Sequence, residues 1–285
     1  MTSKIGRLLF ISGLFLSFCT MGCGPPGTSQ SYGTAGVTEK IITLPNTHQI
    51  RTLMSAERQN PKAFVIFIHG TPGSADTWLD TMAKTPANIT SVAYDRLGFG
   101  SSRPKGAVTS LKEHAETVAL LKRAVVQGQN TPTILVGHSY GGPIAAKVAV
   151  QYPEEITAII LVAAALDPSL EKIHWAQRLA TYQPIKFLIG STLRNANAEL
   201  ITLEQELVDL QTQINDTAVA TYVLHGSEDE LVPAENVAFM KRQYQPSALC
   251  SIEMIEGQNH FLPWNEIDRL WALIERSINT PAAAC

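Results

Sequence analysis

The sequence predicts an α/β fold in which a mostly parallel, eight-stranded sheet carries helices on both faces. Short apolar runs rich in Val and Ile alternate with stretches of helical periodicity along most of the chain, which is typical of such folds. The run 63–68 is apolar at every position, as expected for a strand buried on both faces of a parallel sheet. One run, 133–136, continues through a glycine-containing turn into the small-residue helical stretch 142–151.

The predicted elements follow one another in a regular order. A β-hairpin over 37–44 and 48–54 turns at Pro45-Asn46. Six further strands are predicted at 63–68, 89–94, 133–136, 156–162, 218–224 and 251–255. Helices are predicted at 76–84, 111–127, 142–151, 234–243 and 264–278. Because strands and helices alternate, we expect neighbouring strands to be parallel.

The first 22 residues have the features of an export signal. Lys4 and Arg7 precede an apolar stretch, 8–18, that is short for a membrane-spanning helix. The sequence Thr20-Met21-Gly22-Cys23 then resembles the lipidation site of a bacterial lipoprotein. We therefore expect a signal peptide over 1–22, a lipid on Cys23 and attachment to the bacterial cell envelope. Plain cleavage and an uncleaved anchor are the alternatives.

The remaining chain divides into a tether, a core and a cap. Residues 23–36 are rich in Gly, Ser and Pro, which predicts a flexible tether. Residues 37–166 and 217–285 are predicted to form one α/β core. The insert 167–216 lacks a strand pattern and is predicted to be a helical cap, with a leucine stripe on a helix over 198–214. The apolar side chains expected to shape a pocket in the cap are Trp175, Phe187, Leu188 and Ile189.

Composition excludes some classes of function. The net charge is −3 and basic clusters are absent from the sequence, which argues against a nucleic-acid partner. The sequence has no CxxC or HExxH motif, so we expect no metal and no cofactor. Cys250 and Cys285 could pair in an exported domain. They are isolated and Cys285 is the last residue, so we expect them to be unpaired.

Residues 137–141 form a G-x-S-x-G pentapeptide, GHSYG, between the strand 133–136 and the helix 142–151. This strand–turn–helix context predicts a nucleophile elbow that exposes the hydroxyl of Ser139. The strand and the helix are expected to pass closely at Gly137 and Gly141, which is possible because glycine has no side chain. An ordinary glycine-rich turn with an incidental serine is the alternative.

A serine nucleophile needs a base, and His260 is the best-placed histidine. It follows the last predicted strand, at the carboxyl ends of the strands, where ligands bind in parallel α/β folds. His69 and His225 each precede a glycine, and we expect them to support turns. His138 adjoins the nucleophile, and we expect its side chain to point elsewhere.

Asp229 is the favoured acid of a catalytic triad, because it follows a strand and precedes His260 in the order Ser…Asp…His. Asp167, after the preceding strand, is the alternative. The developing oxyanion needs two donors, and the backbone N–H of Tyr140 is one of them. The other is predicted to be the N–H of Thr71, since Pro72 has none.

Five segments, HGTPG, DRLGFGSS, GHSYGG, HGSEDELVP and NHF, resemble the α/β-hydrolase superfamily in their order and spacing. The resemblance covers about residues 40–278, and HGTPG is similar to the loop of prolyl aminopeptidases and small capped esterases. It implies an α/β-hydrolase fold and hydrolysis of an ester, thioester or amide through an acyl-serine. The glycine-containing segment around Asp95-Arg96 is expected to be a structural turn rather than a phosphate loop, because it lacks the lysine and spacing of one.

The leading hypothesis is a cofactor-independent carboxylic ester hydrolase acting on a small molecule. The first alternative is an aminopeptidase that prefers N-terminal proline and binds the free amine with carboxylates of the cap. Candidates for this role are Glu199, Glu204, Glu206 and Asp209, although their spacing predicts a solvated helix face. A second alternative is a surface-anchored binding protein that retains the triad.

Overall fold

The computed structural model describes residues 29–128, 130–172, 177–178, 181, 189–280 and 285. Eight strands of this part of the chain form one sheet in the order β1-β2-β4-β3-β5-β6-β7-β8. β2 pairs antiparallel with β1 and β4, and all other pairs are parallel. This confirms the predicted α/β-hydrolase fold. The strands are β1 (Val37–Thr43), β2 (Gln49–Ser55), β3 (Ala63–Ile68), β4 (Ile89–Tyr94), β5 (Thr133–His138), β6 (Ala158–Val162), β7 (Ala220–Gly226) and β8 (Leu249–Ile255).

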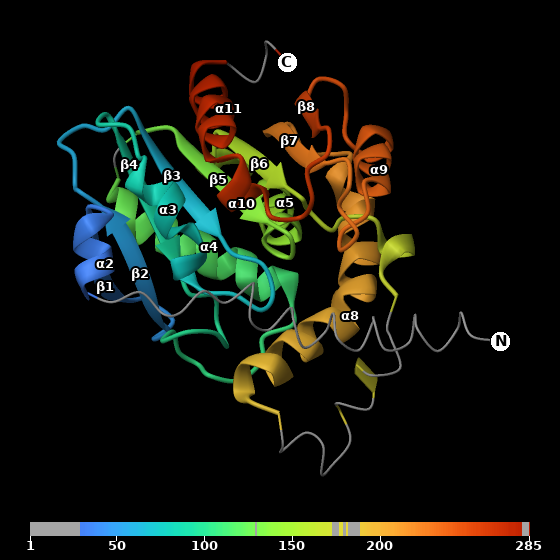
Figure 1. Cartoon of the computed structure of the whole chain (residues 1–285), viewed down its shortest axis with the longest axis horizontal. Coiled ribbons are helices and arrows are strands. Elements are labelled where there is room, and N and C mark those ends of the chain that lie inside the picture. Colours follow the sequence, from blue (N-terminus) through green and yellow to red (C-terminus); the bar gives the residue numbers. More distant parts are fainter. Residues whose placement is uncertain (1–28, 129, 173–176, 179–180, 182–188, 281–284) are drawn as a thin grey trace.

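Helices cover both faces of the sheet (Figure 1). One apolar core cluster joins the sheet to α4, α5, α8 and α9, and a second joins the opposite face to η1, α3 and α11. The helices are α2 (Ser29–Thr34), η1 (Ala75–Trp78), α3 (Leu79–Ala83), α4 (Leu111–Val126), α5 (Gly141–Gln151), η2 (Pro153–Glu155), η3 (Pro168–Leu170), α8 (Ser191–Ile214), α9 (Glu235–Gln243), α10 (Leu262–Asn265) and α11 (Ile267–Asn279).

The boundaries of several helices differ from the prediction. The helix predicted over 76–84 consists of the 3₁₀ turn η1 followed by α3. The final helix is divided into α10 and α11 at Glu266. The cap helix α8 begins at Ser191, seven residues before the predicted start at Ala198. Residues 191–197 are mostly polar, so the apolar periodicity that identified this helix begins only after them.

The cap helix packs against the body of the fold. Leu203, Leu207, Leu210 and Ile214 lie along one stripe and are buried in the same core cluster as α4 and α5. Three of the side chains predicted to shape a cap pocket, Trp175, Phe187 and Leu188, lie outside the described residues. The fourth, Ile189, is half-buried.

The segment predicted as a flexible tether is partly folded. Residues Ser29–Thr34 form α2, and Tyr32 is buried against the core. Its hydroxyl donates to Asp76 Oδ1 at 2.7 Å and accepts a hydrogen bond from Arg51. The Gly- and Ser-rich composition did not indicate that its one aromatic residue has buried partners. The predicted signal peptide and Cys23 lie outside the described residues, and none of the described helices has the length and apolarity to cross a membrane.

Cys250 and Cys285 form a disulfide, so the expectation that they are unpaired is wrong. The helix α11 runs back beside β8, and near its end Arg276 Nη2 donates to Ser251 Oγ at 3.1 Å. Cys285 lies at the start of β8, where its Cα atom is 4.5 Å from that of Cys250. The two cysteines are 35 residues apart in the sequence, and no pattern in the sequence indicated that they meet.

Candidate active site

Ser139 stands at a sharp turn between β5 and α5. Its φ angle is +54°, in the left-handed region that non-glycine residues rarely adopt. A Cβ atom on Gly137 would lie 2.3 Å from the carbonyl oxygen of Gly141, and one on Gly141 would lie 2.3 Å from that of Ile68. Both positions therefore require glycine, as the sequence predicts, and the close passage of strand and helix holds Ser139 at the carboxyl end of β5.

His260 and Asp229 are joined by a short hydrogen bond. His260 lies in the loop between β8 and α10, and its Nδ1 is 2.7 Å from Asp229 Oδ2. The other oxygen of this carboxylate accepts from the backbone N–H groups of Leu231 (3.0 Å) and Val232 (2.9 Å). Burial alone would raise the pKa of Asp229, but the hydrogen bond and charge of His260 and the backbone N–H groups outweigh it and lower this pKa. The carboxylate is therefore ionised and oriented toward His260.

The alternative acid, Asp167, has different partners. Its Oδ1 accepts hydrogen bonds from the backbone N–H (2.9 Å) and the hydroxyl (2.7 Å) of Ser169. Through these bonds Asp167 caps the 3₁₀ turn η3. Arg242 is its ionic partner at 3.9 Å. Of the two predicted acids, the structure brings Asp229 to His260 and uses Asp167 in a local turn.

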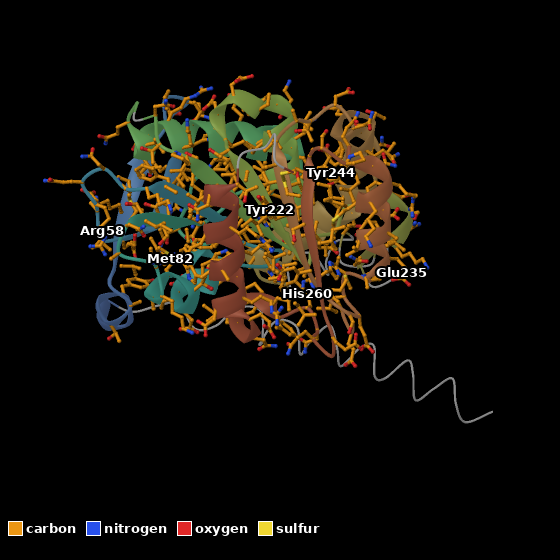
Figure 2. All side chains as sticks on the ribbon, turned by 90° about the horizontal axis from the view of Figure 1, so that it is seen from above. Arg58, Met82, Tyr222, Glu235, Tyr244 and His260 are labelled. Atoms are coloured by element: carbon orange, nitrogen blue, oxygen red, sulfur yellow. A yellow bond between two sulfur atoms is a disulfide. The ribbon has the colours of Figure 1, made fainter. Side chains whose placement is uncertain are left out.

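One pocket of about 50 Å³ brings the predicted reactive groups together. It is lined by Gly70, Thr71, Pro72, Thr77, His138, Ser139, His260, Phe261 and Trp264. Figure 2 shows His260 near the edge of the molecule, with Tyr222 of β7 further inside. Ser139 and His260, which are both described residues, form no hydrogen bond with each other. In free enzymes the distance between nucleophile and base is often long, and it shortens when substrate binds.

The predicted oxyanion donors lie on the two loops that border this pocket. Thr71 lines it directly, in the loop after β3, and Tyr140 follows Ser139 at the start of α5. A Cβ atom on Gly70 would lie 2.9 Å from Ser139 Cβ, so the loop passes very close to the elbow. The hydroxyl of Thr71 is buried and has no hydrogen-bond partner among the described residues.

The prediction for His138 is wrong, and those for two other histidines are confirmed. His138 lines the pocket, its Nε2 lies 3.0 Å from the carbonyl oxygen of His260, and the two rings are 4.7 Å apart. Burial and, secondarily, His260 lower the pKa of His138 to about 3. The position of His138 next to Ser139 in the sequence did not indicate this contact, because the contact depends on where the distant loop of His260 folds. His69 and His225 bond to carbonyl oxygens of their own turns, those of Gly70 (2.7 Å) and Val232 (2.9 Å).

Glu199 does not lie on a solvated helix face. It is fully buried and its carboxylate is paired with Arg96. Glu206 is half-buried and accepts from the backbone N–H of Leu111 at 2.7 Å, whereas Glu204 and Asp209 are exposed. The helical spacing alone did not indicate that the stripe containing Glu199 meets a buried arginine.

The predicted structural turn after β4 is built around Asp95. Its carboxylate accepts from the backbone N–H groups of Ala75 (2.8 Å) and Ser101 (2.7 Å) and pairs with Arg51. Within the described residues, no group of three or more His, Cys, Asp or Glu side chains could hold a metal ion.

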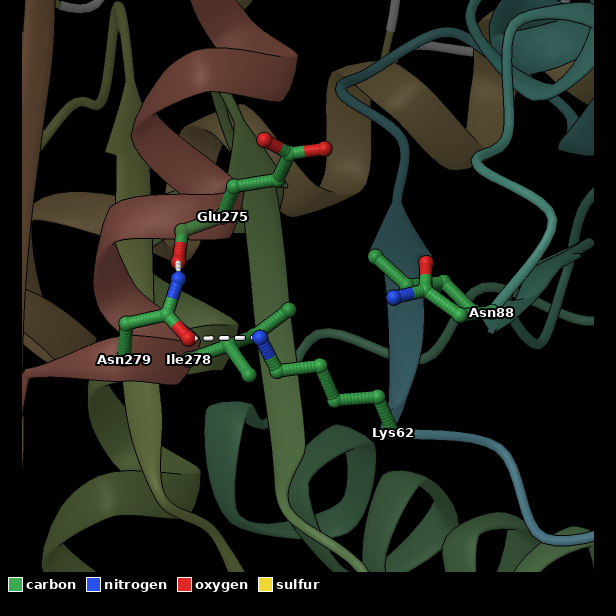
Figure 3. Close-up of a pocket in the computed structure, with 6 residues that line it drawn as sticks. Lys62, Asn88, Glu275, Ile278 and Asn279 are labelled. Carbon is green, nitrogen blue, oxygen red and sulfur yellow. Dashed lines mark hydrogen bonds between the residues drawn. The ribbon is translucent and has the colours of Figure 1, made fainter.

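A second pocket, of about 130 Å³, lies at the amino ends of β3 and β4 (Figure 3). Lys62 and Asn88, which precede β3 and β4, line it together with the end of α11. Lys62 Nζ donates to Asn279 Oδ1 at 2.6 Å. This pocket contains none of the predicted catalytic residues.

Comparison with known families gives a clear assignment. The model of the family described as Serine aminopeptidase, S33 matches residues 59–212, more than half of the chain. The chain therefore belongs to this family, whose match includes Ser139 and most of the cap.

Individual relatives agree with the fold. The human (Lyso)-N-acylphosphatidylethanolamine lipase is 32% identical over 134 residues, which are 43% of this chain and 36% of the relative. The chain thus spans about a third of that relative's length. A solved structure of a membrane phospholipase A has a TM-score of 0.66 at 19% identity and covers 98% of this chain and 100% of its own. An esterase from Exiguobacterium antarcticum has a TM-score of 0.62 at 18% identity, with coverages of 85% and 100%.

Proposed function

We propose that this protein is a serine hydrolase that cleaves carboxylic esters through a Ser139-His260-Asp229 triad and an acyl-enzyme. The observation that carries the proposal is the 2.7 Å hydrogen bond from His260 Nδ1 to Asp229, with His260 and Ser139 lining one pocket. Because Nδ1 carries the proton toward Asp229, Nε2 is left free to act as a base. Relatives named as lipases, phospholipases and esterases support an ester as the substrate.

Each residue has a defined role in the proposed reaction. Ser139 Oγ attacks the acyl carbon while His260 Nε2 takes its proton, and the N–H groups of Thr71 and Tyr140 stabilise the oxyanion. The tetrahedral intermediate collapses, the C–O bond breaks, and His260 returns the proton to the leaving alkoxide. Water then attacks the acyl-serine with His260 as base, which releases the carboxylic acid and regenerates Ser139. Asp229 keeps His260 in the required tautomer throughout.

The test is turnover of short p-nitrophenyl esters by the wild-type protein and by Ser139→Ala. The variant should keep the wild-type melting temperature and lose nearly all turnover. A folded Ser139→Ala protein with the wild-type rate would refute the proposal. A wild-type protein that neither turns over esters nor reacts with a fluorophosphonate would instead support a binding protein.

An aminopeptidase is the second candidate, because the description of the matching family names one. Binding of a free N-terminal amine requires an available carboxylate near the pocket. Glu199 is unsuited to this role, because it is fully buried and occupied by Arg96. Release of aniline from proline anilide at a higher kcat/KM than that for esters would favour the aminopeptidase.

We also propose that the protein is exported and held at the cell envelope by a lipid on Cys23. The support is the signal-like sequence before Cys23. Only five residues separate Cys23 from α2, so the lipid would hold the folded core close to the membrane. Mass spectrometry of the mature N-terminus should find a diacylated Cys23, and an unmodified N-terminus at another residue would refute this part.

A further inference from the structure

Arg96 lies at the centre of a buried network that joins the cap helix α8 to the loop after β3. It follows Asp95 at the carboxyl end of β4, and its side chain is fully buried. Its Nε donates to the carbonyl oxygen of His69 at 3.0 Å, and its Nη2 donates to that of Gly70 at 3.0 Å. One guanidinium therefore holds two consecutive carbonyl groups of the loop that leads to Thr71.

The carbonyl oxygen of Gly70 has a second donor. The backbone N–H of Arg96 donates to His69 Nε2 at 3.0 Å, so the ring proton of His69 is assigned to Nδ1. This Nδ1 donates to the Gly70 oxygen at 2.7 Å. Burial, and after it the charge of Arg96, lower the pKa of His69 well below its usual value, so the neutral ring keeps this arrangement. The Gly70 carbonyl is thus fixed by two groups.

A fixed Gly70 carbonyl determines where the N–H of Thr71 points. The Gly70–Thr71 peptide is trans, since the cis bonds among the described residues are those before Pro72 and Pro104. In a planar trans peptide, the carbonyl oxygen and the following N–H point in opposite directions. The Thr71 N–H therefore points away from Arg96. Gly70 and Thr71 line the pocket of Ser139, and Arg96 is buried behind their loop.

The same guanidinium also supports the second oxyanion donor. Its Cζ lies 4.8 Å from the ring centroid of Tyr140 and 4.7 Å from that of Phe99. Such cation–π contacts are strengthened by burial. Glu199 on α8 accepts from both terminal nitrogens of Arg96, with Nη2 to Oε2 at 3.0 Å, and provides the opposite charge.

We infer that Arg96 is the positioning residue of the oxyanion hole and that Glu199 on the cap helix fixes Arg96 in place. Arg96 acts through the peptide of Gly70–Thr71 and through the ring of Tyr140, and does not touch the substrate. The inference rests on the proposed function, since it concerns the oxyanion of that reaction. It links the position of the cap to the transition state of the reaction.

Two variants test this inference. Arg96→Lys keeps the charge but loses the planar fork that reaches both carbonyls and Glu199. Glu199→Gln keeps the shape and one acceptor but removes the charge. We expect either variant to lower kcat for a p-nitrophenyl ester by roughly 10- to 100-fold with little change in KM. The affinity for an aryl boronic acid, which forms a tetrahedral adduct with the serine, should fall by a similar factor, while that for the carboxylic acid product should not change.

Arg51→Lys is the matched control, because Arg51 is another buried arginine, and it bonds to Tyr32, Glu39, Asp76 and Asp95. This variant should have a lower melting temperature but wild-type kcat and boronate affinity. If Arg96→Lys does not fold, Glu199→Gln alone decides the question. Folded variants with wild-type kcat, or an equal loss of boronate and product affinity, would overturn the inference. Failure of the proposed function would appear differently, as wild-type turnover that does not depend on Ser139.

Discussion

His138 Nε2 donates a hydrogen bond to the backbone carbonyl oxygen of His260 across 3.0 Å, although the two residues are 122 positions apart in the chain. The ring of His138 also packs edge-on against Trp78 and Trp264. Since His138 directly precedes Ser139, this contact ties the loop of the proposed base to the turn of the proposed nucleophile. His138 therefore has a place in the site that its position in the motif did not predict.

Removal of this contact should loosen the loop of His260. In His138→Ala the carbonyl oxygen of His260 loses its donor, and an unsatisfied buried group costs about 1–3 kcal/mol. We expect kcat for a p-nitrophenyl ester to fall by about 10-fold or more, and His138→Gln to lose less because its amide can still donate. His48→Ala, in the β1–β2 turn, is the control and should keep the wild-type rate. Equal rates for His138→Ala and wild type would show that the contact does not position the base.

Stability should depend on pH through His138. Its folded-state pKa is about 3, whereas an unfolded histidine titrates near 6.5. Between these values the unfolded chain binds the extra proton, so the free energy of unfolding falls as the pH is lowered, by about 1.4 kcal/mol per pH unit. Urea unfolding at pH 7 and 5 should show a smaller loss for His138→Gln than for wild type. Parallel pH profiles for the two proteins would contradict the buried, neutral state of His138.

The identity of the acid can be tested with a pair of variants. Asp229→Asn removes the charge that orients His260 and should lower kcat by about 10³- to 10⁴-fold. Asp167→Asn changes a carboxylate that caps a 3₁₀ turn, and it should leave kcat within about 2-fold of wild type. Steady-state ester hydrolysis measures both. A large loss in Asp167→Asn with a small loss in Asp229→Asn would reverse the assignment.

The disulfide should contribute to stability but not to catalysis. Cys250 and Cys285 close a loop with a sequence separation of 35, and such a crosslink stabilises by roughly 2–4 kcal/mol. The double variant Cys250→Ser, Cys285→Ser should unfold at a lower urea concentration and keep the wild-type kcat. Addition of a reductant should shift the wild-type midpoint toward that of the variant, and leave the midpoint of the variant unchanged. A wild-type midpoint insensitive to reductant would argue against the crosslink.

Local patterns were sufficient to predict the sheet and the elbow. Burial on both faces leaves few alternatives to a strand for the runs at β3, β4 and β5. Close passage of the backbone likewise leaves few alternatives to glycine at positions 137 and 141. The pairing of His260 with Asp229 was predicted on different grounds, from the order Ser…Asp…His along the chain.

Contacts between distant segments were not predictable in this way. The pair Arg96 and Glu199, the contact of His138 with His260 and the Cys250–Cys285 bond each join residues that no periodicity relates. Tyr32 in α2 is a similar case, because its partners Arg51 and Asp76 lie in other elements. Sequence identifies which residues carry chemistry, whereas the packing of loops and helices determines which of them meet.

Peptide mass spectrometry after an acid quench, during turnover of a p-nitrophenyl ester, tests directly whether Ser139 forms an acyl-enzyme. We predict that the peptide containing Ser139 gains the mass of one acyl group and that the same peptide of Ser139→Ala gains none. Turnover that continues while Ser139 stays unmodified, or an acyl group found on a different residue, would contradict it.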